Sequence, residues 1–166
     1  MSDELKSELV ALLPRLRRFA YSLTGNLDEG DDVVQTACLK ALDRLDQFER
    51  GSRLDSWMFR IVQTSFIDET RRQRRKQATS DPEALDRLSD GGLGAAAGED
   101  RLHLAEVRAA VAQLSEEQRS VLGLIAIDGR SYKEAAEILN LPIGTVMSRL
   151  ARARERLSRL TEGAAA

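Results

Sequence analysis

The stretch Ser131–Arg154, SYKEAAEILNLPIGTVMSRLARAR, decides the fold class. Its first part, Tyr132–Leu139, has the period of a short helix. The triplet Asn140–Pro142 then makes a tight turn, and a longer helix begins near Ile143. A short helix, a brief turn and a second helix are typical of a helix-turn-helix. We therefore predict that motif over these residues.

The second helix of the motif carries two parallel stripes. The apolar stripe follows steps of three and four residues and comprises Ile143, Val146, Leu150, Ala153, Leu157 and Leu160. Beside it runs a polar, mostly cationic stripe of Thr145, Arg149, Arg152, Arg156 and Arg159. Solvated charge is the ordinary explanation of such a stripe. The preceding short helix and turn instead favour DNA, where early arginines read guanine edges and later ones contact phosphates.

The rest of the C-terminal part is also helical in period. Ser115 with Gln118, and Ser131 with Glu134, have the spacing of capping boxes and predict helix starts near 116 and 132. The dipeptide Asp128-Gly129 predicts a turn between those helices. We expect this helical part to run from about 101 to 162.

The N-terminal part, residues 1–76, predicts three helices. The first is broken at Thr24–Asn26, the second runs over about 28–45, and the third over about 53–75. Ser52, with Asp55 three residues on, resembles a capping box for the third helix. Since no segment alternates like a strand, the predicted class is all-α.

Residues 77–100 differ in composition from both flanking parts. They are rich in glycine, alanine and acids, and Asp81–Glu83 could start one short helix. Such a stretch buries too little apolar area to offset its ordering entropy. We expect a flexible linker there, joining two small helical domains that do not share one continuous core.

Composition excludes several classes of protein. The 166 residues include one cysteine, Cys38, and one histidine, His103, so neither an intrachain disulfide nor a Cys–His zinc site is expected. No run approaches the length of a membrane span, and Met1–Leu13 lacks the apolar core of a signal peptide. We find no catalytic constellation and expect no cofactor and no metal. A single cysteine, which cannot form an intrachain disulfide, fits a cytoplasmic location.

The N-terminal part carries two polar surfaces of opposite sign. Arg53, Trp57, Arg60, Thr64 and Arg71 fall on one stripe, and an aromatic between arginines suits unstacked bases. Core packing of Trp57 and dipole complementation by the cluster Arg71–Lys76 are the structural alternatives. The acids Asp28, Glu29, Asp31 and Asp32 open the second helix and, with Gln35, form an exposed patch.

Two blocks of this sequence resemble one family. The first comprises Asp31–Gln35, Phe48–Ser52, Ser56–Ile61 and Arg71-Arg72, and it is similar to region 2 of extracytoplasmic-function sigma factors. The second comprises Leu114-Ser115, Asp128–Ala136, Pro142–Arg149 and Arg152–Arg154, and it is similar to their region 4. Both blocks stand in the family's order. The resemblance implies a non-enzymatic factor that directs core RNA polymerase to promoters and helps open the −10 region.

The resemblance also implies roles for single residues. Asp31, Asp32 and Gln35 match the surface that binds the clamp helices of the polymerase β′ subunit. The −10 element would be bound by the loop and the helix after it, at Phe48, Arg50, Gly51, Ser52, Arg53, Trp57, Arg60, Thr64 and Arg71. The −35 element would be read by Thr145, Ser148, Arg149, Arg152 and Arg156. Further implied partners are the β flap and a cognate anti-sigma factor.

Two other kinds of protein remain as alternatives. A stand-alone helix-turn-helix regulator would bind duplex DNA without polymerase. An interaction module that sequesters another factor would not need the stripe that contains Arg149 and Arg152. Run-off transcription with core polymerase separates them. For Cys38, burial as an inert thiol is expected rather than redox sensing.

Overall fold

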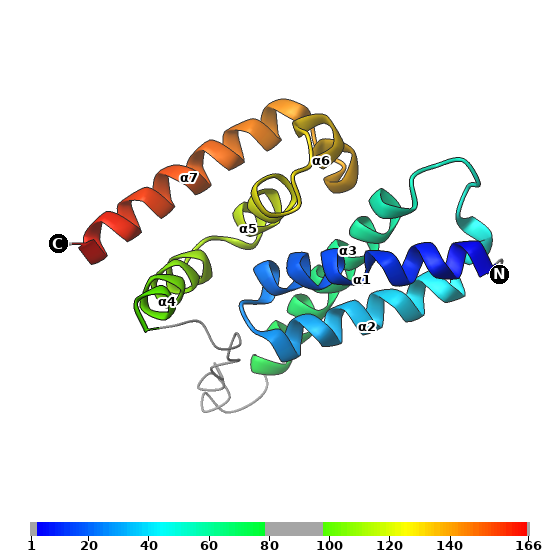
Figure 1. Cartoon of the computed structure of the whole chain (residues 1–166), viewed down its shortest axis with the longest axis horizontal. Coiled ribbons are helices and arrows are strands. Elements are labelled where there is room, and N and C mark those ends of the chain that lie inside the picture. The colour runs from blue at the N-terminus through cyan, green and yellow to red at the C-terminus, as the bar shows by residue number, and fades with distance from the viewer. Residues whose placement is uncertain (1–2, 79–97, 166) are drawn as a thin grey trace.

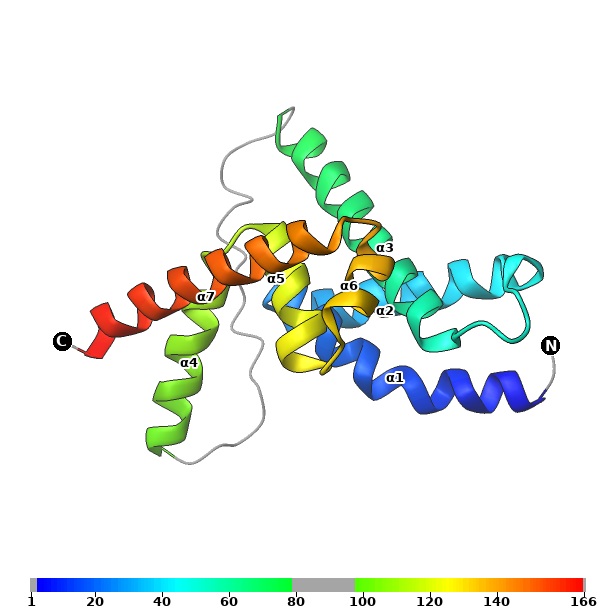
Figure 2. The same cartoon turned by 90° about the horizontal axis from the view of Figure 1, so that it is seen from above.

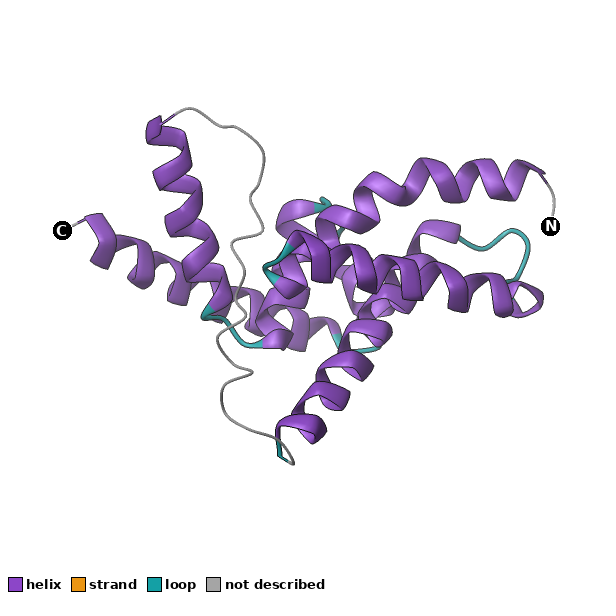
Figure 3. Cartoon of the chain, turned by 90° about the horizontal axis from the view of Figure 1, so that it is seen from below, coloured by secondary structure: helices purple, strands orange, loops and turns teal. Residues whose placement is uncertain are grey.

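The computed structural model describes residues 3–78 and 98–165, and every regular element within those ranges is helical (Figures 1 and 3). The N-terminal half consists of α1 (Asp3–Thr24), α2 (Leu27–Asp43), the 3-10 turn η1 (Leu45–Gln47) and α3 (Leu54–Gln77). The C-terminal half consists of α4 (Gly98–Ala112), α5 (Glu116–Leu122), the π-helical turn η3 (Gly123–Ile127), α6 (Tyr132–Leu139) and α7 (Ile143–Ala165). The all-α prediction is confirmed for this part of the chain.

The helices α1, α2 and α3 pack pairwise against one another. The break between α1 and α2 follows from Gly25, whose φ of 73° suits glycine, and from Asn26. The Asn26 side chain accepts hydrogen bonds from the backbone N–H groups of Asp28 (2.9 Å) and Glu29 (3.2 Å), which caps α2. A Cβ on Gly30 would lie 3.2 Å from the backbone nitrogen of Tyr21, so glycine allows α1 and α2 to approach closely.

The predicted capping box at Ser52 is wrong. Arg53 is the N-cap residue of α3, and it makes no side-chain capping hydrogen bond. The Ser52 hydroxyl donates instead to the carbonyl of Glu49 (2.6 Å), which closes the preceding turn. The Asp55 carboxylate accepts from the backbone N–H of Ser56 and pairs with arginines, so it is not available to the cap.

The helix-turn-helix prediction agrees with α6 and α7. Ser115 and Gln118 form the complete predicted box at the start of α5. Ser131 accepts from the backbone N–H of Glu134 (3.1 Å), but the Glu134 carboxylate turns to arginines, so only half of that box forms. Asn140 ends α6 in the left-handed region with a φ of 54°, which turns the chain into α7.

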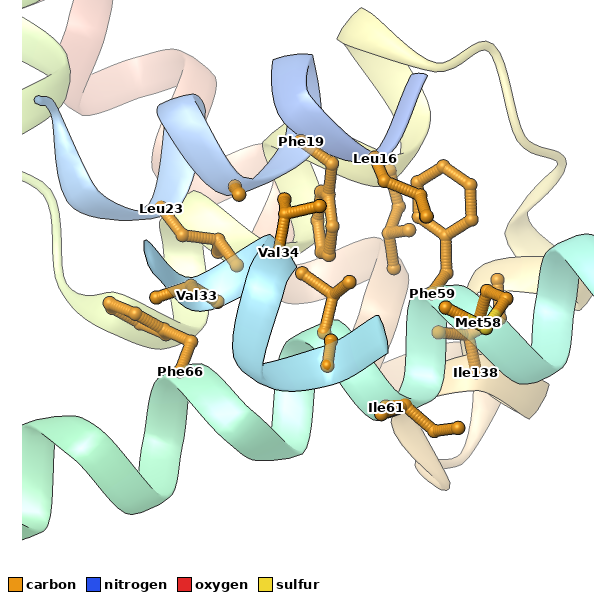
Figure 4. Close-up of a cluster of buried hydrophobic side chains, with 14 of the residues drawn as sticks. Leu16, Phe19, Leu23, Val33, Val34, Met58, Phe59, Ile61, Phe66 and Ile138 are labelled. Carbon is orange, nitrogen blue, oxygen red and sulfur yellow. The ribbon is translucent and has the colours of Figure 1, made fainter. Parts of the chain in front are cut away.

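One continuous cluster of buried apolar residues runs through both halves, which corrects the expectation of separate cores. Its N-terminal members include the fully buried Phe19 and Phe59, whose ring centroids lie 5.2 Å apart. Ile138, from α6 of the C-terminal half, lies beside Met58 of α3 in this cluster (Figure 4). The physical reason is that α1 and α3 keep apolar surface that α2 leaves uncovered, and η3 and α6 cover it.

The linker predicted at 77–100 falls largely outside the described residues. Within the described part, α3 continues to Gln77 and α4 begins at Gly98. The short helix expected at Asp81–Glu83 lies outside those residues, and the division at 1–76 and 101–162 stays a prediction. Among the helices described, none combines the length and hydropathy that a membrane-spanning segment requires.

Candidate nucleic-acid interface

The acidic face of α2 is open to solvent. Asp31, Asp32 and Gln35 are all exposed, as predicted. Asp31 pairs with Arg17 of α1 at 2.8 Å, whereas Asp32 lines a groove of about 320 Å³ between α2 and α3. Glu29 lines the same groove. Burial, with the nearby charges of Asp32 and Glu69, raises the pKa of the Glu29 carboxyl.

The groove also contains acids that the sequence reasoning missed. Asp68 and Glu69 of α3 line it opposite Asp32, next to the cations Lys40 and Arg72. Lys40 and Asp68 form an ion pair across the two helices at 3.6 Å. Sequence spacing shows which residues share one helix face, but it does not show that faces of two helices meet. The acidic surface is therefore broader than the run that opens α2.

The loop before α3 holds an aromatic pair. The rings of Phe48 and Trp57 lie 5.1 Å apart, and both side chains are half-buried against the core. Gly51, with a φ of 94°, turns the loop, while Arg50 and Ser52 are exposed. Trp57 thus packs against the core, as one of the two interpretations expects, and part of its side chain stays open to solvent; contact with bases stays a prediction.

The cationic residues of α3 contact the C-terminal half. Arg60 donates to the backbone carbonyls of Glu137 and Ile138 at the end of α6. Arg53 pairs with Glu134 of α6 at 2.8 Å and with Asp55 at 2.9 Å.

The remaining predicted −10 residues of α3 do not take part in this contact in the same way. The Thr64 hydroxyl donates to carbonyls of its own helix, at Arg60 and Ile61 (both 3.1 Å), and Arg71 is exposed near the end of α3. The predicted stripe therefore exists on one face of α3, but its first half meets α6.

The predicted −35 residues lie along α7 in the predicted pattern. Of the predicted apolar stripe, Val146, Leu150 and Ala153 are buried and Leu157 and Leu160 are half-buried, whereas Ile143, in the first turn of α7, is 49% exposed and does not join the core. Ser148, Arg152 and Arg156 are exposed, and Thr145 and Arg149 are half-buried. Across residues 3–78 and 104–162, none of the arginines Arg149, Arg152 and Arg156 forms an ion pair with an acid. Their charge is available to an outside anion.

A cluster of three arginines and three acids joins the halves, and the sequence reasoning missed it. Its members are Arg15, Arg53, Arg130, Asp55, Asp128 and Glu134. Arg130 is 5% exposed and pairs with Asp128 (2.8 Å), Glu134 (2.9 Å) and Asp55 (3.0 Å). Its guanidinium carbon also lies 4.8 Å from the centroid of the Phe59 ring.

The cluster changes how its acids titrate. Burial alone would raise the pKa of Asp55, but hydrogen bonds from Arg53 and from the Ser56 N–H, with the charge of Arg130, hold it below its ordinary value. The hydrogen bond from Arg130 likewise lowers the pKa of Glu134. Both acids therefore stay ionised at neutral pH.

Cys38 is half-buried on α2, and burial raises the pKa of its thiol. Nucleophilic chemistry needs the thiolate, which a raised pKa disfavours at neutral pH. This environment agrees with the expectation of an inert thiol.

Two descriptions of known families match the chain. Sigma-70 region 2 matches residues 9–76, and sigma-70 region 4 matches residues 104–157. The two matches cover most of the chain and leave out the stretch between them. They correspond to the N-terminal and C-terminal halves of the structure.

Similar proteins and structures agree with these matches. The chain is 39% identical over 161 residues to the ECF RNA polymerase sigma factor EcfG of Rhodopseudomonas palustris, which covers 96% of this chain and 86% of that protein. It is 36% identical over 132 residues to the ECF RNA polymerase sigma-E factor of Escherichia coli, covering 75% and 69%. The fold is similar to that of the sigma factor RpoE in complex with the anti-sigma factor NepR from Bartonella quintana, with a TM-score of 0.81 and 35% identity over 97% of this chain and 98% of that one. A further similar structure is CnrH in complex with the cytosolic domain of CnrY, with a TM-score of 0.69 and 28% identity over 95% and 87%. The chain belongs to the extracytoplasmic-function RNA polymerase sigma factors.

Proposed function

We propose that this sigma factor binds core RNA polymerase through α2 and reads promoter DNA with α3 and α7. The observation that carries this assignment is the separation of charge: the exposed acids Asp31 and Asp32 lie on α2, whereas the arginine stripes lie on α3 and α7. Acids repel the DNA backbone, so the α2 face suits a protein partner. The formal net charge of −2 then reflects two opposed surfaces rather than a lack of DNA-binding ability.

The −10 element is assigned to the loop before α3 and to α3 itself. The half-buried pair Phe48 and Trp57 stands beside the turn at Gly51, and the exposed Arg53 and Arg60 supply positive charge nearby. Taking a base out of the stack costs a few kcal/mol, which a pocket offsets only for the base that fits. Recognition at this site is thereby coupled to strand opening.

The −35 element is assigned to α7. Its buried stripe fixes the helix on α4, α5 and α6, which leaves Ser148 and Arg152 exposed toward a major groove. Arg149 is half-buried near the start of the helix, where its side chain is positioned by packing. A positioned guanidinium suits bidentate contact with guanine, and exposed Arg156 suits a phosphate.

The partners proposed are core RNA polymerase, at the β′ clamp helices and the β flap, promoter DNA and a cognate anti-sigma factor. The last is supported by two similar structures, in which RpoE is bound to NepR and CnrH to the cytosolic domain of CnrY. Action in the cytoplasm accords with these partners. A stand-alone regulator is not favoured, because the region 2 match covers residues 9–76 and not only the helix-turn-helix.

Charge reversal on α2 tests the polymerase assignment. Asp32→Arg should weaken binding to core polymerase at least tenfold and lower run-off transcription, whereas Asp43→Arg, at the other end of the same helix and also exposed, should not. Asp32 stands in the second turn of α2, so the free energy of unfolding should change by no more than about 1 kcal/mol. Unchanged core affinity in folded Asp32→Arg would contradict the assignment.

A further inference from the structure

The first turns of α7 present apolar side chains to solvent. Ile143 and Met147 are each 49% exposed, and neither belongs to the buried apolar cluster. Ala151, one turn farther on, is exposed as well. Residues four apart lie on the same side of a helix, so these three form one side of α7, which we call the apolar flank. Single exposed apolar residues are ordinary, but two large ones side by side on a helix assigned to DNA need an explanation.

The apolar flank and the arginine stripe lie on different sides of α7. At 3.6 residues per turn, Arg149 and Arg152 fall across the outer surface of the helix from Met147, and Gly144 and Ser148 lie between them. The opposite surface of α7 packs on α4, α5 and α6, away from α1–α3 (Figures 1 and 2). The outer surface therefore has one cationic side, one apolar side and small residues between the two.

The small residues let this end of α7 come close to a ligand. A Cβ on Gly144 would meet nothing within 4 Å, so the fold itself leaves room for a larger side chain there. The Ser148 hydroxyl donates to the carbonyl of Thr145 at 3.1 Å, along its own helix. The major groove of B-DNA is about 12 Å wide, close to the diameter of a helix with its side chains. Both flanks can therefore meet base edges at once.

Thymine is the base whose major-groove edge suits Met147. The edges of adenine, guanine and cytosine present hydrogen-bonding groups there, whereas thymine adds a C5-methyl group. A thioether donates no hydrogen bond and accepts only weakly, so methionine against a polar edge would remove water without replacing its hydrogen bonds. Against the methyl group, two apolar surfaces leave water together. The unbranched methionine side chain has three rotatable bonds and so adapts to where the methyl group stands.

We propose that Met147 is a specificity-determining residue of α7 and recognises the methyl group of a thymine in the −35 element, on either strand. Ile143 is its neighbour on the same flank. The proposal rests on the assignment of α7 to the −35 element. The thymine belongs to a different base pair from the one assigned to Arg149, because the two side chains stand on different sides of the helix. An arginine contact with guanine and an apolar contact with thymine then select two positions of the element.

Replacing thymine by deoxyuridine tests the proposal, since it removes the methyl group and leaves every hydrogen-bonding group in place. The probe is a promoter duplex that the wild-type holoenzyme selects from a pool randomised over the −35 element. Each thymine of the selected element, on both strands, is replaced in turn, and holoenzyme affinity is measured by competition. The variants are Met147→Ala, the conservative Met147→Leu and, as a matched control, Leu104→Ala. Leu104 lies on α4, outside the surfaces assigned to DNA, and is 43% exposed.

We expect one replacement to lower the affinity of the wild-type holoenzyme about fourfold, which corresponds to about 0.8 kcal/mol for one methyl-sized group. Met147→Ala should bind the selected probe more weakly and should no longer distinguish thymine from deoxyuridine. Met147→Leu, which keeps an apolar side chain of similar size, should retain most of the discrimination, and Leu104→Ala all of it. Because Met147 is exposed, thermal unfolding of Met147→Ala, followed by circular dichroism, should match that of the wild type.

Three outcomes would overturn the proposal. They are a selected element without an A·T pair, a wild-type holoenzyme indifferent to every deoxyuridine, and full discrimination in Met147→Ala. If discrimination persists in Met147→Ala while its affinity for core polymerase falls, the apolar flank binds protein instead of DNA. Each of these leaves the assignment of α7 standing as long as Arg149→Ala loses its preference at one position. Selection of no −35 sequence at all would contradict that assignment itself.

Discussion

The two helices assigned to DNA, α3 and α7, carry similar arginine stripes but differ in what those arginines contact. Arg60 of α3 and Arg53, the N-cap residue of that helix, are bound to α6. Arg149, Arg152 and Arg156 of α7 form no ion pair within the described residues. Arginines at the same helical spacing are therefore bound by other parts of the chain on α3, whereas on α7 their charges stay open to an outside partner.

This difference arises from where each helix sits. The helix α3 packs against α1, α2 and α6, whereas α7 packs on α4, α5 and α6, on the side of the C-terminal half away from α1–α3 (Figures 1 and 2). DNA binding by a helix that lies inside an interface can be regulated by opening that interface. DNA binding by a helix on the outside needs only the fold of its own half, so α7 should bind duplex DNA in either arrangement.

The largest expected effect comes from truncating Phe59, the aromatic residue on which the arginines of the charged cluster pack. Phe59 is fully buried, contacts Phe19, and lies beneath the guanidinium groups of Arg15 and Arg130 at 5.5 and 4.8 Å. Phe59→Ala should lower the free energy of unfolding by about 3–5 kcal/mol, since it leaves a cavity and an unsupported charge cluster. Urea unfolding followed by circular dichroism measures this loss.

The exposed Val10 provides the control for that measurement. Its side chain is 63% exposed, so Val10→Ala should change the free energy of unfolding by no more than about 0.5 kcal/mol. A loss for Phe59→Ala as small as this one would show that the shared core contributes little, and the difference between α3 and α7 would then not depend on packing.

The next effect concerns the open helix, α7. Arg149→Ala should cost about 1–3 kcal/mol in holoenzyme binding and relax the preference at one position of the −35 element. Arg156→Ala, farther along the helix, should weaken binding evenly across sequences and flatten its salt dependence. Holoenzyme binding to a set of −35 variants at two salt concentrations separates these outcomes. Equal losses of binding for the two variants on every sequence would show that α7 contacts phosphates and reads no base.

Much of the fold could be predicted from periodicity and caps. The Ser115 box gave the start of α5, and the triplet Asn140–Pro142 gave the turn of the helix-turn-helix. These features are local, because a cap satisfies backbone groups within one turn of its own residue. The prediction failed at Ser52, where two local hydrogen bonds compete: the hydroxyl can cap α3 or close the turn at Glu49, and it closes the turn.

The sequence predicts which residues form each polar stripe, but it does not predict which residues those stripes contact in the fold. The exposure of Asp32 and Arg152 follows from helix period alone. The pair Arg15–Asp128 joins residues 113 positions apart, and no pattern along the chain indicates it. Separate cores were expected because the glycine-rich stretch suggests independent halves, yet α1 and α3 keep apolar surface that α5, η3 and α6 cover.

The smallest expected effect is a shift with pH of the closed arrangement, in which the two halves are in contact, and it should reduce the difference between α3 and α7. The pKa values of Asp55 and Glu134 lie below their ordinary values of 3.8 and 4.5. Only the attractions of Arg130 for Asp55 and of Arg53 for Glu134 cross between the halves, so only this part of the lowering stabilises the closed form above the ordinary pKa values, and it is lost as the pH falls through the lowered values. The radius of gyration of the free protein should therefore rise below about pH 4, before helix content is lost. Glu134→Gln separates this effect from general acid unfolding, since an amide does not titrate: its closed form should be weaker at pH 7 and should change less between pH 5 and pH 3. If wild type and Glu134→Gln expand over the same pH range by the same amount, Glu134 does not help to hold the two halves together, and the contact between α3 and α6 must rest on Arg60 and the apolar core alone.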